Sequence, residues 1–192
     1  MPKVTFMRHG QTYLNKENRF AGNVETDLTP EGIAETAANF HYTDDDFDVI
    51  YVSPLRRTLQ TLDAAMPVHK EPIVDARIQE RSVGEWEALP YANFSDEVIE
   101  NYIKGFIDPP GSESFAQVRK RVVSFVEDLF SKYDEDTRIL VVSHAGILRQ
   151  VRDVFLPDMP KRKIKNSELI YVVNEDFDKY NKKKEKEDDF DM

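Results

Sequence analysis

The chain has 192 residues, a formal net charge of −10 and no cysteine. This length suits one ordinary domain with a sizeable core, and the lack of cysteine excludes disulfides, thiolate catalysis and cysteine-ligated metal sites. The negative charge disfavours nucleic acid and anionic membranes as partners, and no apolar run reaches membrane-spanning length. We therefore expect a cytoplasmic protein, in which any bound anion is held by a local cluster of positive charges.

The first predicted strand ends in a polar cluster. Residues 4–7 form an apolar run typical of a buried strand, and Arg8, His9 and Gly10 follow it. In α/β sheets, ligands bind at the carboxyl ends of the strands. Arginine offers a fork of donors that fits phosphate oxygens, and a neutral histidine is a nucleophile near pH 7. The pair indicates a nucleophile beside an anion clamp.

Two helices are predicted before and after the second strand, residues 48–52. The first helix begins at Thr29 and Pro30. The second follows Ser53, the expected N-cap, and Pro54, which fits a first helical turn. The inward residues are expected to be Ile33, Ala34, Ala37 and Phe40 in the first helix, and Leu55, Leu59 and Leu62 in the second.

Polar groups suited to phosphate also follow the second strand and a later one. Arg56 and Arg57 lie in the expected first turn of the second helix, where free backbone N–H groups favour anions. His144 and Gly146 follow the apolar strand at residues 139–142. Three strand ends that each deliver such groups indicate one composite anion site.

The middle of the chain departs from the alternation of strands and helices. Residues 81–110 mix aromatic and acidic side chains without a clear period, which predicts an inserted cap over the active face, and Trp86 is expected to be structural. A long amphipathic helix follows, with Ser112 or Ser114 as its cap, and its apolar face carries Phe115, Val118, Val122, Phe125, Val126, Leu129 and Phe130.

The C-terminal part holds a helix at residues 147–155 and a strand at residues 169–173. The basic segment 161–165 precedes that strand, so in a parallel arrangement we expect it at the end of the sheet opposite the site. Residues 1–174 are predicted to form the domain, and residues 175–192 a charged, solvated tail.

Four blocks in order give the chain a family resemblance. They are residues 8–12 with Asn15, residues 53–61, residues 78–80 leading to 84–87, and residues 143–146. Here, and over residues 3–173 as a whole, the sequence resembles the histidine phosphatase superfamily. The resemblance, together with the alternating strands and helices, implies a phosphoglycerate mutase-like, three-layer α/β/α fold with a mostly parallel sheet and a small inserted cap.

The resemblance also implies site roles. His9 would be the nucleophile, Glu80 would donate the proton, and the phosphate would be held by Arg8, Arg57 and His144. Glu85 and Glu87 lie close to Glu80 in sequence, and the family pattern favours Glu80. Further candidates for substrate contacts are Gln11, Thr12, Asn15 and the backbone N–H of Ala145.

We therefore expect a phosphomonoesterase that acts on a small phosphorylated metabolite through a phosphohistidine on His9, with neither metal nor cofactor. A cofactor-dependent phosphoglycerate mutase is the alternative, which Val83 disfavours because mutases have a substrate-binding tyrosine there. A non-catalytic phospho-ligand binder is a further alternative, and it would not need the acid Glu80.

Overall fold

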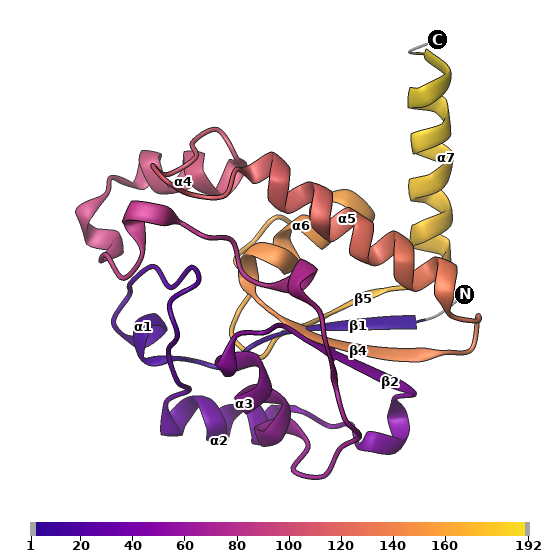
Figure 1. Ribbon diagram of the computed structural model, residues 1–192, viewed down its shortest axis with the longest axis horizontal. Helices are drawn as coiled ribbons and strands as arrows, with labels where there is room; N and C mark the ends of the chain where they lie inside the picture. Colours follow the sequence, from indigo (N-terminus) through magenta and orange to yellow (C-terminus); the bar gives the residue numbers. More distant parts are fainter. Residues whose placement is uncertain (1–2, 191–192) are drawn as a thin grey trace.

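The computed structural model describes residues 3–190 and has a central sheet covered by helices on both faces (Figure 1). The five strands are β1 (Lys3–Arg8), β2 (Val49–Val52), β3 (Ile73–Val74), β4 (Arg138–Ser143) and β5 (Leu169–Val172). Their order in the sheet is β3-β2-β4-β1-β5, and every neighbouring pair is parallel except β1 with β5. The expected three-layer α/β/α architecture with a mostly parallel sheet is confirmed.

The described chain has seven α-helices. Four of them flank the sheet, and one belongs to the cap. They are α1 (Tyr13–Lys16), α2 (Pro30–Asn39), α3 (Arg56–Ala65), α4 (Asp96–Lys104), α5 (Phe115–Lys132), α6 (Ala145–Phe155) and α7 (Asn174–Phe190). Short 3-10 turns lie at Asp44–Asp46, Ala76–Ile78, Gly84–Trp86 and Tyr91–Asn93.

Alternation along the buried strands divides the core into two layers. On β4, Ile139 and Val141 face the large cluster under α5 and α6, whereas Leu140 and Val142 face the cluster beside α3. A strand buried on both faces has a continuous apolar sequence. This pattern is why the buried strands could be predicted from the sequence.

The inward face of α2 differs from the expected one. Ile33 is 47% exposed and Ala34 and Ala37 are also exposed, whereas Gly32 and Thr36 are buried. A Cβ on Gly32 would collide with the backbone of Gln11. The helix therefore rests on the loop after β1 through a small, polar face, and this close approach decides its rotation.

The start and phase of α3 also differ from the prediction. The helix begins at Arg56, and its N-cap is Leu55, which makes no side-chain capping bond. Ser53 therefore lies before the helix, where its Oγ accepts a hydrogen bond from the Leu55 N–H (3.2 Å). Leu59 is 42% exposed, and the buried positions include Arg57 and Thr61. A polar face of α3 thus lines the interior.

The direction of β5 corrects the placement of the basic segment 161–165. Because β5 is antiparallel to β1, the chain that enters β5 lies at the carboxyl end of β1. The Ile164 carbonyl accepts a hydrogen bond from Arg8 Nη1 (2.6 Å), and the Ser167 N–H donates to the Arg8 carbonyl (3.1 Å). The segment therefore borders the site instead of lying opposite it.

The segment 81–110 forms a small cap joined to the loop that follows β1. Phe20 of that loop packs among the cap residues Trp86, Phe94 and Tyr102, and its carbonyl accepts a hydrogen bond from the Ala88 N–H (2.8 Å). The expected structural role of Trp86 agrees with this packing. Figure 1 shows α4 and α1 beyond the carboxyl ends of the central strands, with α4 above α1 in the view.

Residues 174–190 form the helix α7, so the described part of the charged tail is helical, and most of it is exposed. Phe177 in the first turns of α7 is 8% exposed and stacks on Phe130 of α5, with ring centroids 4.4 Å apart. The rest of α7 projects from the body (Figure 1). Among residues 3–190, no helix has both the length and the apolar character needed to cross a membrane.

Candidate active site

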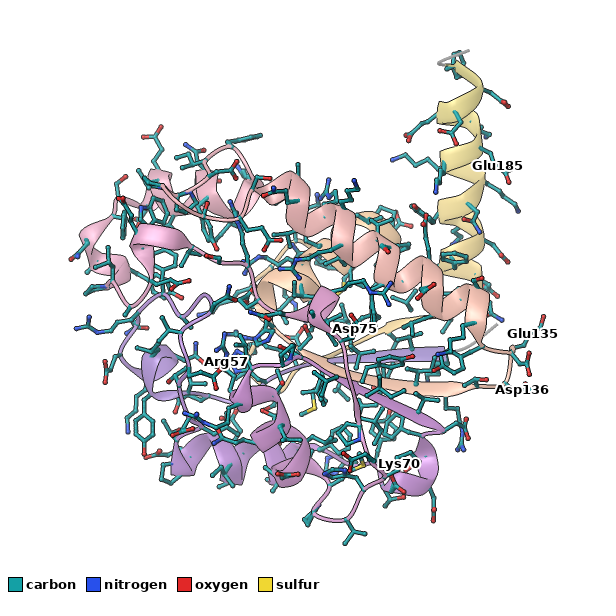
Figure 2. The ribbon with its side chains drawn as sticks, in the orientation of Figure 1. Arg57, Lys70, Asp75, Glu135, Asp136 and Glu185 are labelled. Atoms are coloured by element: carbon teal, nitrogen blue, oxygen red, sulfur yellow. The ribbon has the colours of Figure 1, made fainter. Side chains whose placement is uncertain are left out.

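The carboxyl ends of β1 and β4 and the start of α3 bring four predicted site residues together. Arg8 is 8% exposed, His9 3%, Arg57 1% and His144 0%. The rings of His9 and His144 meet edge to face, with centroids 5.3 Å apart. Figure 2 shows Arg57 beside the carboxyl ends of the central strands. Side chains separated by up to 136 positions in the sequence thus form one buried, positively charged cluster.

The ring of His9 is oriented by its neighbour. Its Nδ1 lies 2.7 Å from the Gly10 carbonyl oxygen, and because a carbonyl only accepts, Nδ1 carries the proton and donates. Nε2 is then left with a free lone pair. Burial lowers the pKa of His9 well below its usual value, and the charges of Arg57 and Arg8 lower it further. His9 is accordingly neutral at physiological pH.

His144 has the same tautomer for a different reason. The hydroxyl of Ser53 accepts from the Leu55 N–H and has no acceptor other than His144 Nε2, 2.7 Å away, among residues 3–190, so we assign its proton to that bond. Nδ1 then carries the other proton and is a donor. Burial, followed by the charge of Arg57, also lowers the pKa of His144 well below the ordinary range.

The two arginines are anchored by backbone carbonyls. Arg57 donates from Nη1 to the Val24 carbonyl (2.9 Å) and from Nη2 to the Gly22 carbonyl (2.7 Å), while Arg8 donates to the Ile164 carbonyl. Burial, followed by the repulsion of Arg149, lowers the pKa of Arg8 to about 10, and burial also lowers the pKa of Arg57. These anchors fix both guanidinium groups without neutralising them.

Three N–H groups of this cluster lack a hydrogen-bond partner among residues 3–190. They belong to Arg8 Nε, Arg57 Nε and His144 Nδ1, and all three atoms are buried. A buried donor left unpaired costs about 1–3 kcal/mol, so such groups call for an explanation. Three of them on neighbouring cationic or dipolar side chains suit an anion with several oxygens.

Glu80 lies at the edge of the cluster. Its Oε1 accepts a hydrogen bond from the Arg81 N–H (2.8 Å), and its Oε2 accepts one from the Gly146 N–H (3.2 Å). A Cβ at Gly146 would collide with Glu80 Oε1, so the glycine makes room for the carboxylate. Glu80 also opposes the effect of burial on the pKa of both Arg8 and Arg57, which places its charge near them.

The two rival acids lie elsewhere. Glu85 is exposed, and Glu87 accepts a hydrogen bond from the Asn23 N–H (3.2 Å) through Oε1. Neither carboxylate bonds to the start of α6 as Glu80 does. The geometry therefore favours Glu80 among the three.

Three of the four remaining candidates, Gln11, Thr12 and Asn15, make hydrogen bonds within or next to the loop after β1. Thr12 and Asn15 form a capping box on α1, in which each side chain accepts from the other's backbone N–H (3.2 and 3.1 Å). The amide oxygen of Gln11 accepts from the Thr29 hydroxyl (2.9 Å). Ala145 opens α6 directly after His144. These bonds shape the walls of the site, and direct substrate contacts by the four residues stay predictions.

Sequence reasoning missed two residues that support His9 and Gly10, namely Thr61 and Asn166. Asn166 Nδ2 donates to the His9 carbonyl (3.2 Å) and to Asn15 Oδ1 (3.1 Å). The Thr61 hydroxyl accepts from the Gly10 N–H (2.9 Å). Thr61 lies in the recognised block at residues 53–61, but Asn166 has no motif, and only the antiparallel direction of β5 would have revealed it.

Within residues 3–190, no group of three or more histidine, cysteine, aspartate or glutamate side chains could hold a metal ion. The groups gathered at the strand ends are donors with positive charge or positive dipoles. An arrangement of this kind binds oxyanions and is poorly suited to a cation.

Known structures share this fold. A mycobacterial glucosyl-3-phosphoglycerate phosphatase in complex with VO3 superposes with a TM-score of 0.74 at 22% identity, over 88% of this chain and 91% of the other. A phosphoglycerate mutase from Thermus thermophilus gives a TM-score of 0.71 at 23% identity, over 88% and 92% of the two chains. The expected phosphoglycerate mutase-like fold is confirmed.

Sequence comparison agrees with the fold. A putative phosphoserine phosphatase 2 from Hydrogenobacter thermophilus is 29% identical over 158 residues, which cover 79% of this chain and 77% of the relative. The model of the histidine phosphatase superfamily (branch 1) matches residues 4–176, nearly the whole of the chain, including every residue of the buried cluster. The chain therefore belongs to the histidine phosphatase superfamily.

Proposed function

We propose that this chain hydrolyses a small phosphorylated metabolite through a phosphohistidine intermediate on His9. The observation that carries the proposal is the set of three buried, unpaired N–H donors of Arg8, Arg57 and His144 next to a neutral histidine. A phosphoryl group supplies the oxygens that these donors lack. The family and the phosphatase names of its relatives support the same chemistry.

In the first step, His9 attacks phosphorus. Nε2 forms the N–P bond in line as the bond from phosphorus to the ester oxygen breaks, and its lone pair is available because Gly10 holds the proton on Nδ1. Phosphoryl transfer needs mainly positioning and charge neutralisation, because the transition state is loose and its charge spreads over the oxygens. Arg8, Arg57 and His144 Nδ1 meet that need.

Glu80 handles the protons. In its acid form it gives a proton to the departing alkoxide, and in the second step its carboxylate takes a proton from the water that attacks the phosphohistidine. The N–P bond then breaks, and His9 and inorganic phosphate are released. Hydrogen bonds from the Arg81 and Gly146 N–H groups hold the Glu80 carboxylate at the edge of the buried cluster in both steps.

We propose that no metal takes part, because Arg8 and Arg57 neutralise the charge that Mg²⁺ neutralises in other phosphoryl-transfer enzymes, and His144 adds a hydrogen bond. Turnover should persist after exhaustive EDTA treatment, and vanadate should inhibit as a phosphate mimic. Loss of activity with EDTA, restored by Mg²⁺, would contradict this part of the proposal.

A phosphoglycerate mutase is the second candidate, because one structural neighbour has that name. A mutase must retain a bisphosphate while water is excluded. Here Val83 is buried in the cap core, and both cap cations are engaged, Arg81 with Asp108 (2.6 Å) and Lys104 with Glu100 (2.6 Å). A cap without free cations is a weak holder for a second phosphate, which favours hydrolysis. Mutase turnover that depends on 2,3-bisphosphoglycerate and far exceeds hydrolysis would reverse this choice.

Rapid quenching tests the intermediate directly. With a ³²P-labelled phosphomonoester, the protein should carry a label that survives base and is lost in acid. His9→Ala should abolish both the label and turnover, whereas His41→Ala, at an exposed histidine, should keep both. Turnover that survives in His9→Ala would overturn the mechanism.

A further inference from the structure

The peptide bond between His9 and Gly10 is held at both ends by side chains from other parts of the chain. Asn166 Nδ2 donates to the His9 carbonyl oxygen (3.2 Å), and the Gly10 N–H donates to the Thr61 hydroxyl (2.9 Å). That hydroxyl in turn donates to the Arg57 carbonyl (2.7 Å), which ties the peptide to α3. Glycine restricts its own backbone least of all residues, so the orientation of this peptide depends on these partners.

The orientation of this peptide decides how the His9 ring is held. The Gly10 carbonyl accepts from His9 Nδ1 (2.7 Å) and so keeps Nε2 free for attack. That carbonyl is joined to the His9–Gly10 peptide through the freely rotating backbone of Gly10, so a rotation of the peptide would move the carbonyl away from Nδ1. The neutral ring would then lose the acceptor that keeps its proton on Nδ1.

The side-chain amide of Asn166 acts as a donor in this place. Asn15 Oδ1 accepts from the Thr12 N–H (3.1 Å), so this atom is the carbonyl oxygen of the Asn15 amide. Asn166 Nδ2 lies 3.1 Å from the same oxygen and 3.2 Å from the His9 carbonyl oxygen. Both neighbours are acceptors, and the two hydrogens of one NH2 group satisfy them both. Asn166 thus bridges His9 and the capping box of α1.

The backbone directly after Asn166 is held in an uncommon conformation. The φ of Ser167 is +62°, in the left-handed region that a residue with a side chain rarely adopts, and such conformations persist where the surroundings enforce them. The Ser167 and Thr36 hydroxyls lie 2.6 Å apart, and the Ser167 N–H is shared between the Arg8 and His9 carbonyls (3.1 and 3.2 Å). Because the backbone donor is shared, Asn166 supplies the undivided hydrogen bond to the His9 carbonyl.

We propose that Asn166 is a positioning residue for catalysis, whose amide fixes the His9–Gly10 peptide and thereby the tautomer and direction of the nucleophilic ring. The proposal rests on the proposed function and adds to it a residue that acts through His9 rather than on the phosphoryl oxygens.

Asn166→Ala tests the effect on turnover. A displacement of the reacting atom by about 1 Å can cost about 100-fold in rate, so kcat for p-nitrophenyl phosphate should fall on the order of 10- to 100-fold. The inhibition constant of inorganic phosphate should stay near the wild-type value, because Arg8, Arg57 and His144 keep their free donors. Asn166→Asp keeps the shape of the side chain but replaces the NH2 donor by an acceptor, so its kcat should fall at least as far.

The tautomer of His9 gives a readout that a general loss of stability would not change. In the wild type, ¹⁵N spectra of the ring, assigned by comparison with His9→Ala, should show a protonated Nδ1 and an unprotonated Nε2. Asn166→Ala should move the two signals towards each other, because the two tautomers then mix. The matched control is Phe177→Ala, which removes a buried ring from the packing of α7 on α5. It should lower stability and leave both the His9 spectrum and kcat unchanged.

Three results would each overturn the assignment: an unchanged kcat in Asn166→Ala, a fall in kcat with an unchanged His9 spectrum, or the same changes in Phe177→Ala. The spectra are recorded without substrate, so they separate this proposal from the proposed function. If the wild type hydrolyses no phosphomonoester but its His9 spectrum responds to Asn166→Ala as expected, the result supports the hold of Asn166 on His9 and counts against the proposed function.

Discussion

The two buried histidines are suited to different tasks because a carbonyl and a hydroxyl orient their protons. The Gly10 carbonyl leaves His9 Nε2 as a lone pair, whereas the Ser53 hydroxyl leaves His144 Nδ1 as a donor. Burial beside Arg57 keeps both rings neutral. One histidine is thus suited to attack phosphorus and the other to hold its oxygens.

This neutrality makes stability depend on pH. The folded pKa of His9 and of His144 lies below 6.5, the usual value. As the pH falls below that value, the unfolded chain binds protons that the folded chain does not, so the free energy of unfolding decreases until the folded pKa is reached. Each histidine contributes about 1.4 kcal/mol per pH unit in that window.

Urea unfolding in phosphate-free buffer between pH 7.5 and pH 5.5 measures the effect. His144→Asn should lose less stability over this range than the wild type, because one of the two titrating rings is gone. An identical pH dependence in the two proteins would show that His144 is protonated in the folded state, contrary to its environment.

The assignment of the acid is tested by the leaving group. Glu80→Gln should reduce turnover of alkyl phosphates about 10²- to 10⁴-fold, the usual contribution of general acid catalysis. Turnover of p-nitrophenyl phosphate should fall much less, because nitrophenolate leaves without a proton. Glu85→Gln, at an exposed position, is the matched control, and a leaving-group dependence in that variant instead would show that Glu80 is the wrong acid.

At the scale of elements, the start of α6 combines three parts of the site in consecutive residues. His144 is its N-cap, Ala145 is its first residue, and Gly146 donates its N–H to Glu80. Any substitution that shifts this turn should therefore move His144 and Glu80 together.

Gly146→Ala tests the fit between α6 and Glu80. Alanine suits a helix better than glycine, so the fold should be retained, but its Cβ would displace the Glu80 carboxylate. Turnover of alkyl phosphates should therefore fall while p-nitrophenyl phosphate is affected less. The double variant with Glu80→Gln should be no slower than Glu80→Gln alone, because the two changes act on one group. Additive losses would contradict this coupling.

The sequence predicted those elements in which the pattern of apolar residues matches the pattern of buried residues in the structure. The runs that became β1 and β4 are apolar on both faces because helices cover both sides, and the polar residues directly after them had to lie at one edge of the sheet. Arg8, His9 and His144 were predictable for that reason. Arg57 and Glu80 needed the family pattern, because local periodicity did not distinguish them from Arg56 or Glu85.

Long-range packing decided what the sequence could not predict. The rotation of α2 depends on the approach of Gly32 to Gln11, which no apolar period encodes. The direction of β5 brings Ile164 and Asn166 to the site, and strand direction leaves no mark on a short apolar run.

At the scale of the molecule, an acidic chain concentrates positive charge inside, where an anion could bind. The net charge of −10 repels anions at long range, whereas Arg8 and Arg57 act from buried positions where water screens them little. The backbone carbonyls of residues 22, 24 and 164 orient these guanidinium groups without cancelling their charge. If the chain acts as proposed, this separation should favour a small phosphate ester over a polyanion.

The C-terminal helix divides into a packed part and a projecting part. Phe177 stacks between Phe130 and Phe155. Tyr180 and Lys184 both donate to Glu127 Oε1, each at 2.7 Å. After Lys184 the described residues of α7 are exposed, including Phe190 at 92%. Only the first part of the helix therefore completes the core.

Truncation and substitution should separate these two parts. Phe177→Ala should lower the free energy of unfolding by about 3–5 kcal/mol, as expected for the loss of a buried aromatic ring. A chain that ends at Lys184 should stay within about 0.5 kcal/mol of the wild type, because residues 185–190, the described part of the segment that it loses, are exposed. Urea unfolding measures both values. Turnover of p-nitrophenyl phosphate should be unchanged in the truncated chain, because α7 packs on α5 and α6, away from the buried cluster of the candidate site. A truncation that costs as much stability as Phe177→Ala would show that the projecting turns also support the fold.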